Sequence, residues 1–159
     1  MKVEIYTDGG ADPNPGIGGW AALLLSGGQE KVLTGHAPQA TNNRMELTAA
    51  IEALRALKRP CQVNLYTDSE YLRRGITEWI EKWVKQGWQH KGGRPIPNAD
   101  LWKLLWPLVQ RHEISWHWVK GHAGNRYNER VDALARQARL EITPDAQISA
   151  DVPRLYVRS

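Results

Sequence analysis

The sequence predicts an α/β fold, and three observations support this class. Segments 3–8 and 62–68 alternate apolar and polar residues and both end in Tyr-Thr-Asp, as two similar strands would. A helical stretch that Pro60 terminates lies before the second segment, so strand, helix and strand form a βαβ unit with a right-handed crossover. Short apolar runs separated by Gly-rich turns follow the first strand. A chain of 159 residues suits one domain with a sizeable core.

The N-terminal third is expected to be an antiparallel meander. The first strand runs into Asp-Gly-Gly, so we expect Asp8 to lie where that strand gives way to a turn. Apolar runs at 20–25 and 31–35, with a Gly-Gly turn between them, predict two further strands. A buried helix over 20–25 has the same apolar pattern and stays open as an alternative.

Helix caps and breakers set the later elements. Thr41-Asn42-Asn43 offers N-caps, and an apolar face at helical spacing then continues to Lys58-Arg59-Pro60. The remaining expected elements are a strand at 62–67, a helix at 69–86 with a break at Gly75, a loop at 88–97, a helix at 99–110 disturbed at Pro107, a strand at 113–119 and a helix at 125–140.

Composition excludes several classes of protein. With 42% hydrophobic and 24% charged residues and no long apolar run, the chain is predicted to be globular and free of membrane spans. The start shows no secretory signal pattern, and the lone Cys61 rules out an internal disulfide, so we expect a reducing, cytoplasmic location. Lys and Arg number 21 against 17 Asp and Glu, a mild excess that suggests a polyanionic partner.

Four acidic residues stand in positions from which they can converge. Asp8 and Asp68 follow similar strands, and carboxyl ends of parallel neighbours meet at one edge of a sheet. Glu46 lies in the first turn of its predicted helix, and Asp132 lies beside the apolar face of the last one. Each acid alone is explained by a turn or a solvated helix flank. Together they predict an all-oxygen site for Mg²⁺ or Mn²⁺ rather than zinc.

Five motifs occur in the order found in one enzyme family and cover residues 2–140. They are Thr7-Asp8-Gly9-Gly10 with Asn14-Pro15-Gly16, Thr41 to Glu46, Tyr66-Thr67-Asp68-Ser69, Val119-Lys120-Gly121-His122, and Asn128 to Asp132. On these motifs the chain resembles the type-1 ribonucleases H. The resemblance implies a five-stranded mixed sheet, three antiparallel strands and then two parallel ones, flanked by helices. The catalytic domain would span 1–142, and 143–159 would form a C-terminal tail.

The resemblance also implies a mechanism. Asp8, Glu46, Asp68 and Asp132 would hold two Mg²⁺ ions, with Mn²⁺ as a substitute, and Asp8 would bridge them. Two-metal hydrolysis would leave 5′-phosphate and 3′-hydroxyl ends. His122, in a Gly-flanked loop, would transfer protons near neutral pH. Without the resemblance it would be read as an exposed loop histidine.

Aromatic and basic residues alternate in the region before the last helices, as on a nucleic-acid surface. Trp79 and Trp83 stand four apart on a helix, with Lys85 and Lys91 nearby. A buried stripe explains the same Trp spacing, but the segment resembles the family's basic protrusion, which binds the DNA strand, and we therefore favour the surface. Residues implied along the hybrid are Asn14, Thr41, Asn42, Asn43, Arg44, Ser69 and Glu70.

The leading hypothesis is a monomeric endonuclease that cuts RNA in RNA–DNA hybrids. A second class is a hybrid-binding protein without catalysis, which would use the same basic and Trp-rich surface. A third is another nuclease of the same fold, such as a junction resolvase or an integrase. The four acids favour an enzyme, and the Asn-Asn-Arg-Met-Glu motif favours the hybrid nuclease.

Overall fold

A five-stranded mixed sheet forms the centre of the computed structural model, which describes residues 1–90, 92–120 and 125–141. The strands are β1 (Lys2–Ala11), β2 (Gly16–Ser26), β3 (Gln29–Ala40), β4 (Gln62–Thr67) and β5 (Glu113–Trp118), in the order β3-β2-β1-β4-β5. β1, β2 and β3 pair antiparallel, whereas β4 pairs parallel with both β1 and β5. The predicted meander and βαβ unit are confirmed, and 20–25 is strand rather than helix.

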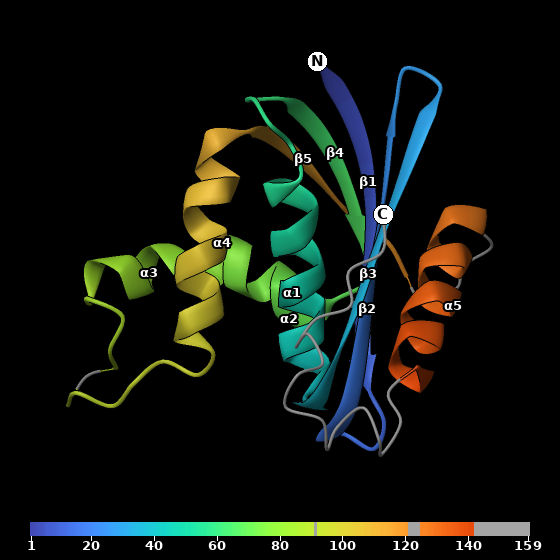
Figure 1. Cartoon of the computed structure of the whole chain (residues 1–159). Coiled ribbons are helices and arrows are strands. Elements are labelled where there is room, and N and C mark those ends of the chain that lie inside the picture. The colour runs from blue at the N-terminus through green and yellow to red at the C-terminus, as the bar shows by residue number, and fades with distance from the viewer. Residues whose placement is uncertain (91, 121–124, 142–159) are drawn as a thin grey trace.

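Helices cover both faces of this sheet. They are α1 (Asn42–Arg55), α2 (Glu70–Arg74), the π-helical turn η1 (Gly75–Trp79), α3 (Ile80–Lys85), α4 (Ala99–Arg111) and α5 (Arg126–Leu140). Figure 1 shows α1 and α4 on one side of the sheet and α5 on the other. Among the helices of the described ranges, none has the length and apolar character needed to cross a membrane.

The larger hydrophobic core lies between the sheet and the helices α1 and α4. Its members with no measurable exposure include Ile5, Trp20, Leu47, Leu65 and Trp102. A smaller cluster under α5 contains Tyr6, Leu23 and Val131. Successive residues of a strand face opposite sides of a sheet, so Ile5 and Tyr6 enter different cores. Both layers therefore fix β1, the strand that carries Asp8.

The end of β1 differs from the prediction. Asp8 does not begin a turn: it pairs with Ala21 inside the strand, and β1 continues through Gly9 and Gly10 to Ala11. The parallel pairing with β4 stops earlier, at Tyr6 opposite Tyr66. Asp-Gly-Gly thus lies where β1 no longer pairs with β4 but still pairs with β2. Glycine occurs here because α1 packs closely against β1 at Gly9, and not because the chain turns.

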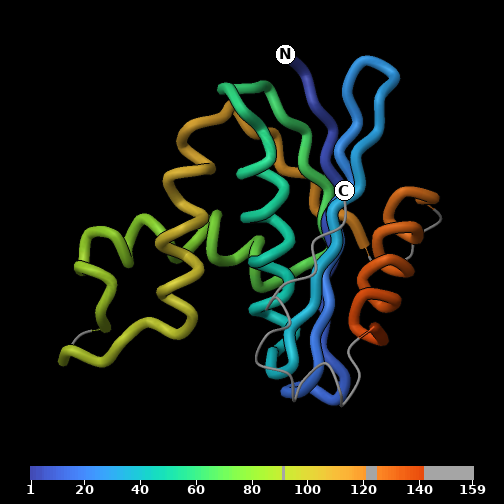
Figure 2. The backbone as a smooth tube through the Cα atoms, viewed as in Figure 1, coloured from blue at the N-terminus to red at the C-terminus, as the bar shows by residue number. Residues whose placement is uncertain are grey.

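The predicted break at Gly75 is a wide turn rather than an end. The N–H of Ile80 donates to the carbonyl of Gly75, five residues earlier, and the trace in Figure 2 continues without interruption from α2 into α3. Gly75 packs against Trp102, where an added Cβ would lie 2.0 Å from the Trp102 ring. Beyond this turn, α3 and the described residues 86–90 and 92–97, here together called the protrusion, extend away from the sheet (Figure 1). Pro107 is accommodated inside α4.

Candidate metal centre and nucleic-acid surface

Three carboxylates meet where β1 and β4 separate. Asp8 projects from β1 two residues beyond Tyr6, the last residue that pairs with β4, and Asp68 directly follows the end of β4. Glu46 comes from α1, where it lies after the first turn and not, as predicted, within it. Each of these side chains offers an oxygen within 4.8 Å of the others. The predicted convergence of two strand-end aspartates with a helical glutamate is therefore present in the structure.

Helix α1 is bound to the unpaired edge of β1. The backbone N–H of Gly9 donates to Glu46 Oε1 at 3.1 Å, and that of Ala11 donates to Asn42 Oδ1 at 2.8 Å. These bonds satisfy strand donors that β4 no longer reaches. The contact requires glycine, because a Cβ on Gly9 would lie 2.4 Å from the backbone carbon of Met45. Glu46 is consequently fixed at the sheet and is only 8% exposed.

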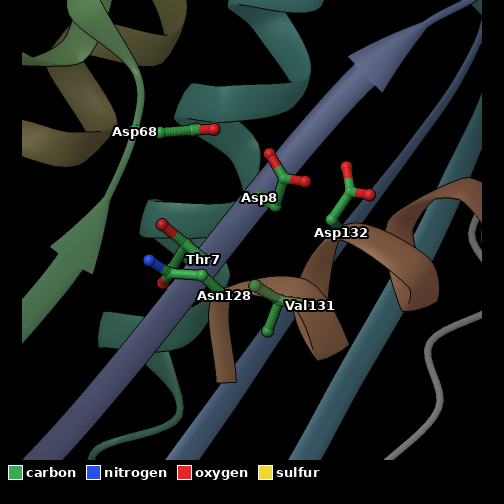
Figure 3. A pocket seen from close by; sticks show the side chains of 6 residues that line it. All are labelled: Thr7, Asp8, Asp68, Asn128, Val131 and Asp132. Carbon is green, nitrogen blue, oxygen red and sulfur yellow. The ribbon is translucent and has the colours of Figure 1, made fainter. Parts of the chain in front are cut away.

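The fourth acid, Asp132, approaches from α5. Asn125 caps this helix by accepting bonds from the N–H groups of Tyr127 and Asn128. Asp132 and Asn128 then line a small cavity together with Asp8 and Asp68. Figure 3 shows the Asp8 carboxylate between those of Asp68 and Asp132. Arg136, one turn later, donates to Asp132 Oδ2 at 2.7 Å and partly neutralises it.

The cluster carries more negative charge than its surroundings stabilise. Burial, followed by repulsion from Asp68, raises the pKa of Asp8 from its ordinary value of 3.8 to about 7. Burial, followed by repulsion from Asp8 and Asp68, raises the pKa of Glu46 well above its usual range. Glu46 Oε2 is buried and has no hydrogen-bond partner among the described residues. An oxygen-only site with an unsatisfied buried carboxylate atom fits hard divalent cations.

Residues predicted to contact the hybrid gather at the N-terminus of α1. Thr41 caps the helix by accepting a bond from the N–H of Arg44 at 3.1 Å. Asn14 Oδ1 accepts a bond from the N–H of Asn42 at 3.1 Å, which joins the loop after β1 to this cap. Asn42 and Asn43 are exposed. The side-chain amides of Asn14, Asn42 and Asn43, here called the amide edge, thus lie at the end of α1 that carries Glu46.

Three further predicted contact residues also have partners within the protein. The Arg44 guanidinium binds the side chains of Asp100 and Asn98. Ser69 is buried and caps α2, with its hydroxyl accepting a bond from the N–H of Leu72 at 3.1 Å. Glu70 is exposed and lies 3.7 and 3.8 Å from Arg73 and Arg74. Glu70 is therefore partly neutralised by its own helix.

The predicted surface placement of Trp83 is wrong. Its side chain is 8% exposed and packs edge-on against the buried Trp102 ring. Trp79 is half-buried, with its ring centroid 5.6 Å from that of Trp83. Both nevertheless line an open cavity of about 570 Å³, whose rim carries Lys82 and the exposed Arg94. The segment thus combines the two interpretations, because Trp rings and basic side chains line the same cavity.

The remaining predicted residues, and two that were not predicted, complete the comparison of sequence and structure. Lys85 is exposed on α3, whereas Lys91 and His122 lie outside the described residues. Asn128 was not singled out, although its position four before Asp132 places both on one face of α5. Tyr71, which lines the 570 Å³ cavity, was also missed. Its spacing to Trp79 does not fit a regular helix, so no periodic signal identified it.

Comparison with known proteins gives consistent matches. The family model described as RNase H matches residues 1–139. A protein named Ribonuclease H from Granulibacter bethesdensis is 60% identical over 139 residues, which are 87% of this chain and 93% of that protein. The crystal structure of LC9-RNase H1, described as a type 1 RNase H with the type 2 active-site motif, has a TM-score of 0.75 at 33% identity and covers 89% of this chain and 74% of that one. LC11-RNase H1 in complex with RNA/DNA hybrid shares the fold, with a TM-score of 0.64 at 20% identity over 92% of this chain and 99% of that one.

Proposed function

The chain belongs to the RNase H family, and from that premise we propose that it hydrolyses the RNA strand of RNA–DNA hybrids. The observation that carries the proposal is the acid cluster: Asp8, Glu46 and Asp68 present oxygens within 4.8 Å of one another. Asp132 lines the adjoining cavity with Asp8 and Asp68. A protein that only bound hybrids would have no use for so many carboxylates in one place, because they repel the phosphates of the ligand.

Asp8, Glu46, Asp68 and Asp132 would hold two divalent ions, Mg²⁺ in the first instance and Mn²⁺ as a substitute. The chemistry that such ions supply is activation of water and neutralisation of an in-line phosphoryl transition state. The protein's own contribution is a set of carboxylates held rigidly by a strand, a strand end and two helices. Hydrolysis of this kind would leave 5′-phosphate and 3′-hydroxyl ends.

The surface around the acids supports a hybrid as the substrate. Telling RNA from DNA requires contacts to 2′-hydroxyls in a wide minor groove. Asn14, Asn42, Asn43, Ser69 and Glu70 would supply these contacts, and Thr41 would lie near a backbone phosphate. Trp79, Lys85 and Lys91 of the opposite side would bind the DNA strand, with Trp83 forming the floor below. Arg44 is not included among the direct contacts, because Asp100 and Asn98 already bind its guanidinium.

The decisive experiment compares three labelled duplexes of the same sequence: an RNA–DNA hybrid, a DNA duplex and an RNA duplex. With Mg²⁺, we expect cleavage of the RNA strand of the hybrid alone, and none with a chelator. Binding of the hybrid without any cleavage would favour the hybrid-binding class. Cleavage of the DNA duplex or of a branched DNA substrate would instead favour a resolvase or integrase of this fold.

Three predictions about the whole protein stay predictions. The domain boundary after residue 142 and the tail at 143–159 stay predictions, and residues 142–159 lie outside the described residues. The monomeric state would be checked by light scattering. The cytoplasmic location is supported by the single cysteine, which is buried as Cys61.

A further inference from the structure

A chain of hydrogen bonds, followed by one aromatic ring contact, connects the helix of Glu46 to the cavity that Trp79 and Trp83 line. It begins at Arg44, two residues before Glu46. Arg44 Nη2 donates to Asp100 Oδ2 at 2.7 Å, and Nη1 donates to Asp100 Oδ1 at 3.0 Å, so the pair is bidentate. Nη1 also donates to Asn98 Oδ1 at 3.1 Å. The first turn of α1 is thereby attached to the start of α4.

The chain continues from Asn98 into the aromatic floor of the 570 Å³ cavity. Asn98 Nδ2 donates to the hydroxyl of Tyr71 at 3.0 Å, and Trp102 Nε1 donates to the same oxygen at 3.1 Å. The Tyr71 ring then contacts Trp79 edge-on, with centroids 5.9 Å apart. One hydroxyl thus connects the polar chain to the rings that line the cavity.

The backbone conformation of Asn98 directs its side chain into this linkage. Its backbone is left-handed, with φ of 58°, a conformation that Asn tolerates better than most residues. In this conformation the side chain caps no backbone group of α4 and is used for Arg44 and Tyr71 instead. The hydrogen bonds between the two side chains raise the pKa of Arg44 and lower the pKa of Asp100, which keeps both groups charged.

We propose that Arg44 is a positioning residue, which through Asp100, Asn98 and Tyr71 fixes the cavity of the protrusion relative to the acid cluster. The inference rests on the proposed function and deepens it. A hybrid bound at both places is held in register only if their separation is fixed, because small displacements of a substrate cost much of the rate. Arg44 would therefore determine where along the RNA the cut falls, without touching a phosphate.

The test compares Arg44→Gln, Asp100→Asn and the double variant on an end-labelled hybrid of defined length. We expect both single variants to raise KM by roughly 3- to 30-fold and to spread the cleavage positions, and the double variant to be no worse than the more affected single one. Arg55→Gln is the matched control: it removes a guanidinium from the same helix, paired with Glu52 at 3.1 Å, and should behave as wild type. Thermal unfolding of each variant reports whether it is folded.

The alternative role, direct binding of a phosphate, makes opposite predictions. Asp100→Asn would then leave KM unchanged or lower it, because it frees the guanidinium. Arg44→Gln would reduce the slope of log affinity against log salt by about one, whereas a positioning residue leaves that slope unchanged. Either result would overturn the inference. Should Arg44→Gln fail to fold, Arg44→Lys keeps the charge but not the bidentate geometry, and unaltered cleavage positions would equally overturn it. A wild type that leaves the hybrid intact would refute the proposed function itself.

Discussion

Gly9 and Glu46 are joined by a 3.1 Å hydrogen bond from the strand N–H to the helix carboxylate, and no side chain separates their backbones. A Cβ on Gly9 would lie within 2.8 Å of three backbone atoms of α1, belonging to Met45 and Glu46. The metal-binding acid of α1 is therefore placed by the absence of a side chain on β1.

Gly9→Ala should displace α1 from β1 and carry Glu46 away from Asp8. We expect a loss of roughly 1–3 kcal/mol in unfolding free energy from overpacking, together with a marked fall in kcat. Gly10→Ala is the control, since its Cβ would approach only Asn42 Oδ1, at an ordinary 3.5 Å. Equal behaviour of the two variants in thermal unfolding and cleavage assays would contradict this account.

Asp8→Asn should reduce cleavage of the hybrid to the level of the metal-free reaction while leaving hybrid affinity largely intact. The reason is that the substitution removes a charge from the centre of the acid cluster but does not alter the amide edge or the protrusion. Steady-state cleavage and fluorescence anisotropy with Mg²⁺ measure the two properties separately. Near-normal activity of Asp8→Asn would show that the site is elsewhere.

The raised pKa of Asp8 predicts how the metal-free protein responds to pH. A carboxyl whose pKa rises from 3.8 unfolded to about 7 folded binds more protons in the folded state between those values. Stability must then fall as pH rises through this window and level off above it. At pH 8 without metal, Asp8→Asn should be more stable than wild type by up to about 4 kcal/mol, since the pKa shift is about three units and one unit corresponds to about 1.4 kcal/mol.

Thermal unfolding at pH 4, 6 and 8, with a chelator and with excess Mg²⁺, checks this expectation. Mg²⁺ should stabilise the wild type increasingly with pH and should have much less effect on Asp8→Asn. A metal-free wild type whose stability rises relative to Asp8→Asn between pH 4 and pH 8 would disagree with the sign.

Variants of Trp83 and Lys85 should distinguish a role in core packing from a role in substrate binding. Because Trp83 is buried against Trp102, Trp83→Ala is expected to lower the unfolding free energy by about 3–5 kcal/mol. Lys85→Ala should leave stability nearly unchanged, raise KM and reduce the salt slope of hybrid binding by about one. Lys31→Ala, on β3, is the control for loss of an exposed lysine. A salt slope unaffected by Lys85→Ala would remove this lysine from the proposed surface.

His122 lies outside the described residues, and its role as a proton shuttle stays a prediction. His122→Ala should lower kcat by about 10²–10⁴-fold, with hybrid affinity little changed, because general acid–base assistance has that magnitude. Some activity should remain where Asp8→Asn retains almost none. Rates across pH 6–9 would show the difference. A wild-type kcat for His122→Ala would return this residue to the class of exposed loop histidines.

Where local chemistry decided the structure, the sequence predicted it. β4 spans 62–67 as expected, although the helix before it ends at Arg55 and not, as predicted, at Pro60. The convergence of Asp8 and Asp68 followed from two strands with the same ending. The strand pattern depends on residues close in sequence, and buried residues do alternate along β4 as that pattern predicts.

Where tertiary contacts decided, the sequence misled. Gly9 and Gly10 look like a turn, but both continue β1, and the missing side chain of Gly9 allows α1 to approach the strand. Trp83 appeared exposed beside lysines, but Trp102, far along the chain, covers it. The Arg44–Asp100 pair joins residues separated by 56 positions, and no local pattern announces such a bond.

The wide turn at Gly75–Trp79 has a consequence for how chain length can vary in this protein. Each residue of an α-helix advances the side-chain direction by about 100°, so residues eight apart normally point in different directions. Here Leu72 and Ile80 are both fully buried, and Tyr71 meets Trp79. The turn thus absorbs one surplus residue and keeps the flanking helices in phase. We expect a chain shortened by one residue within 76–78 to close this turn into an ordinary α-helix and still present Lys82 and Lys85 to solvent, whereas the same deletion within α3 would rotate the basic rim away from its aromatic floor.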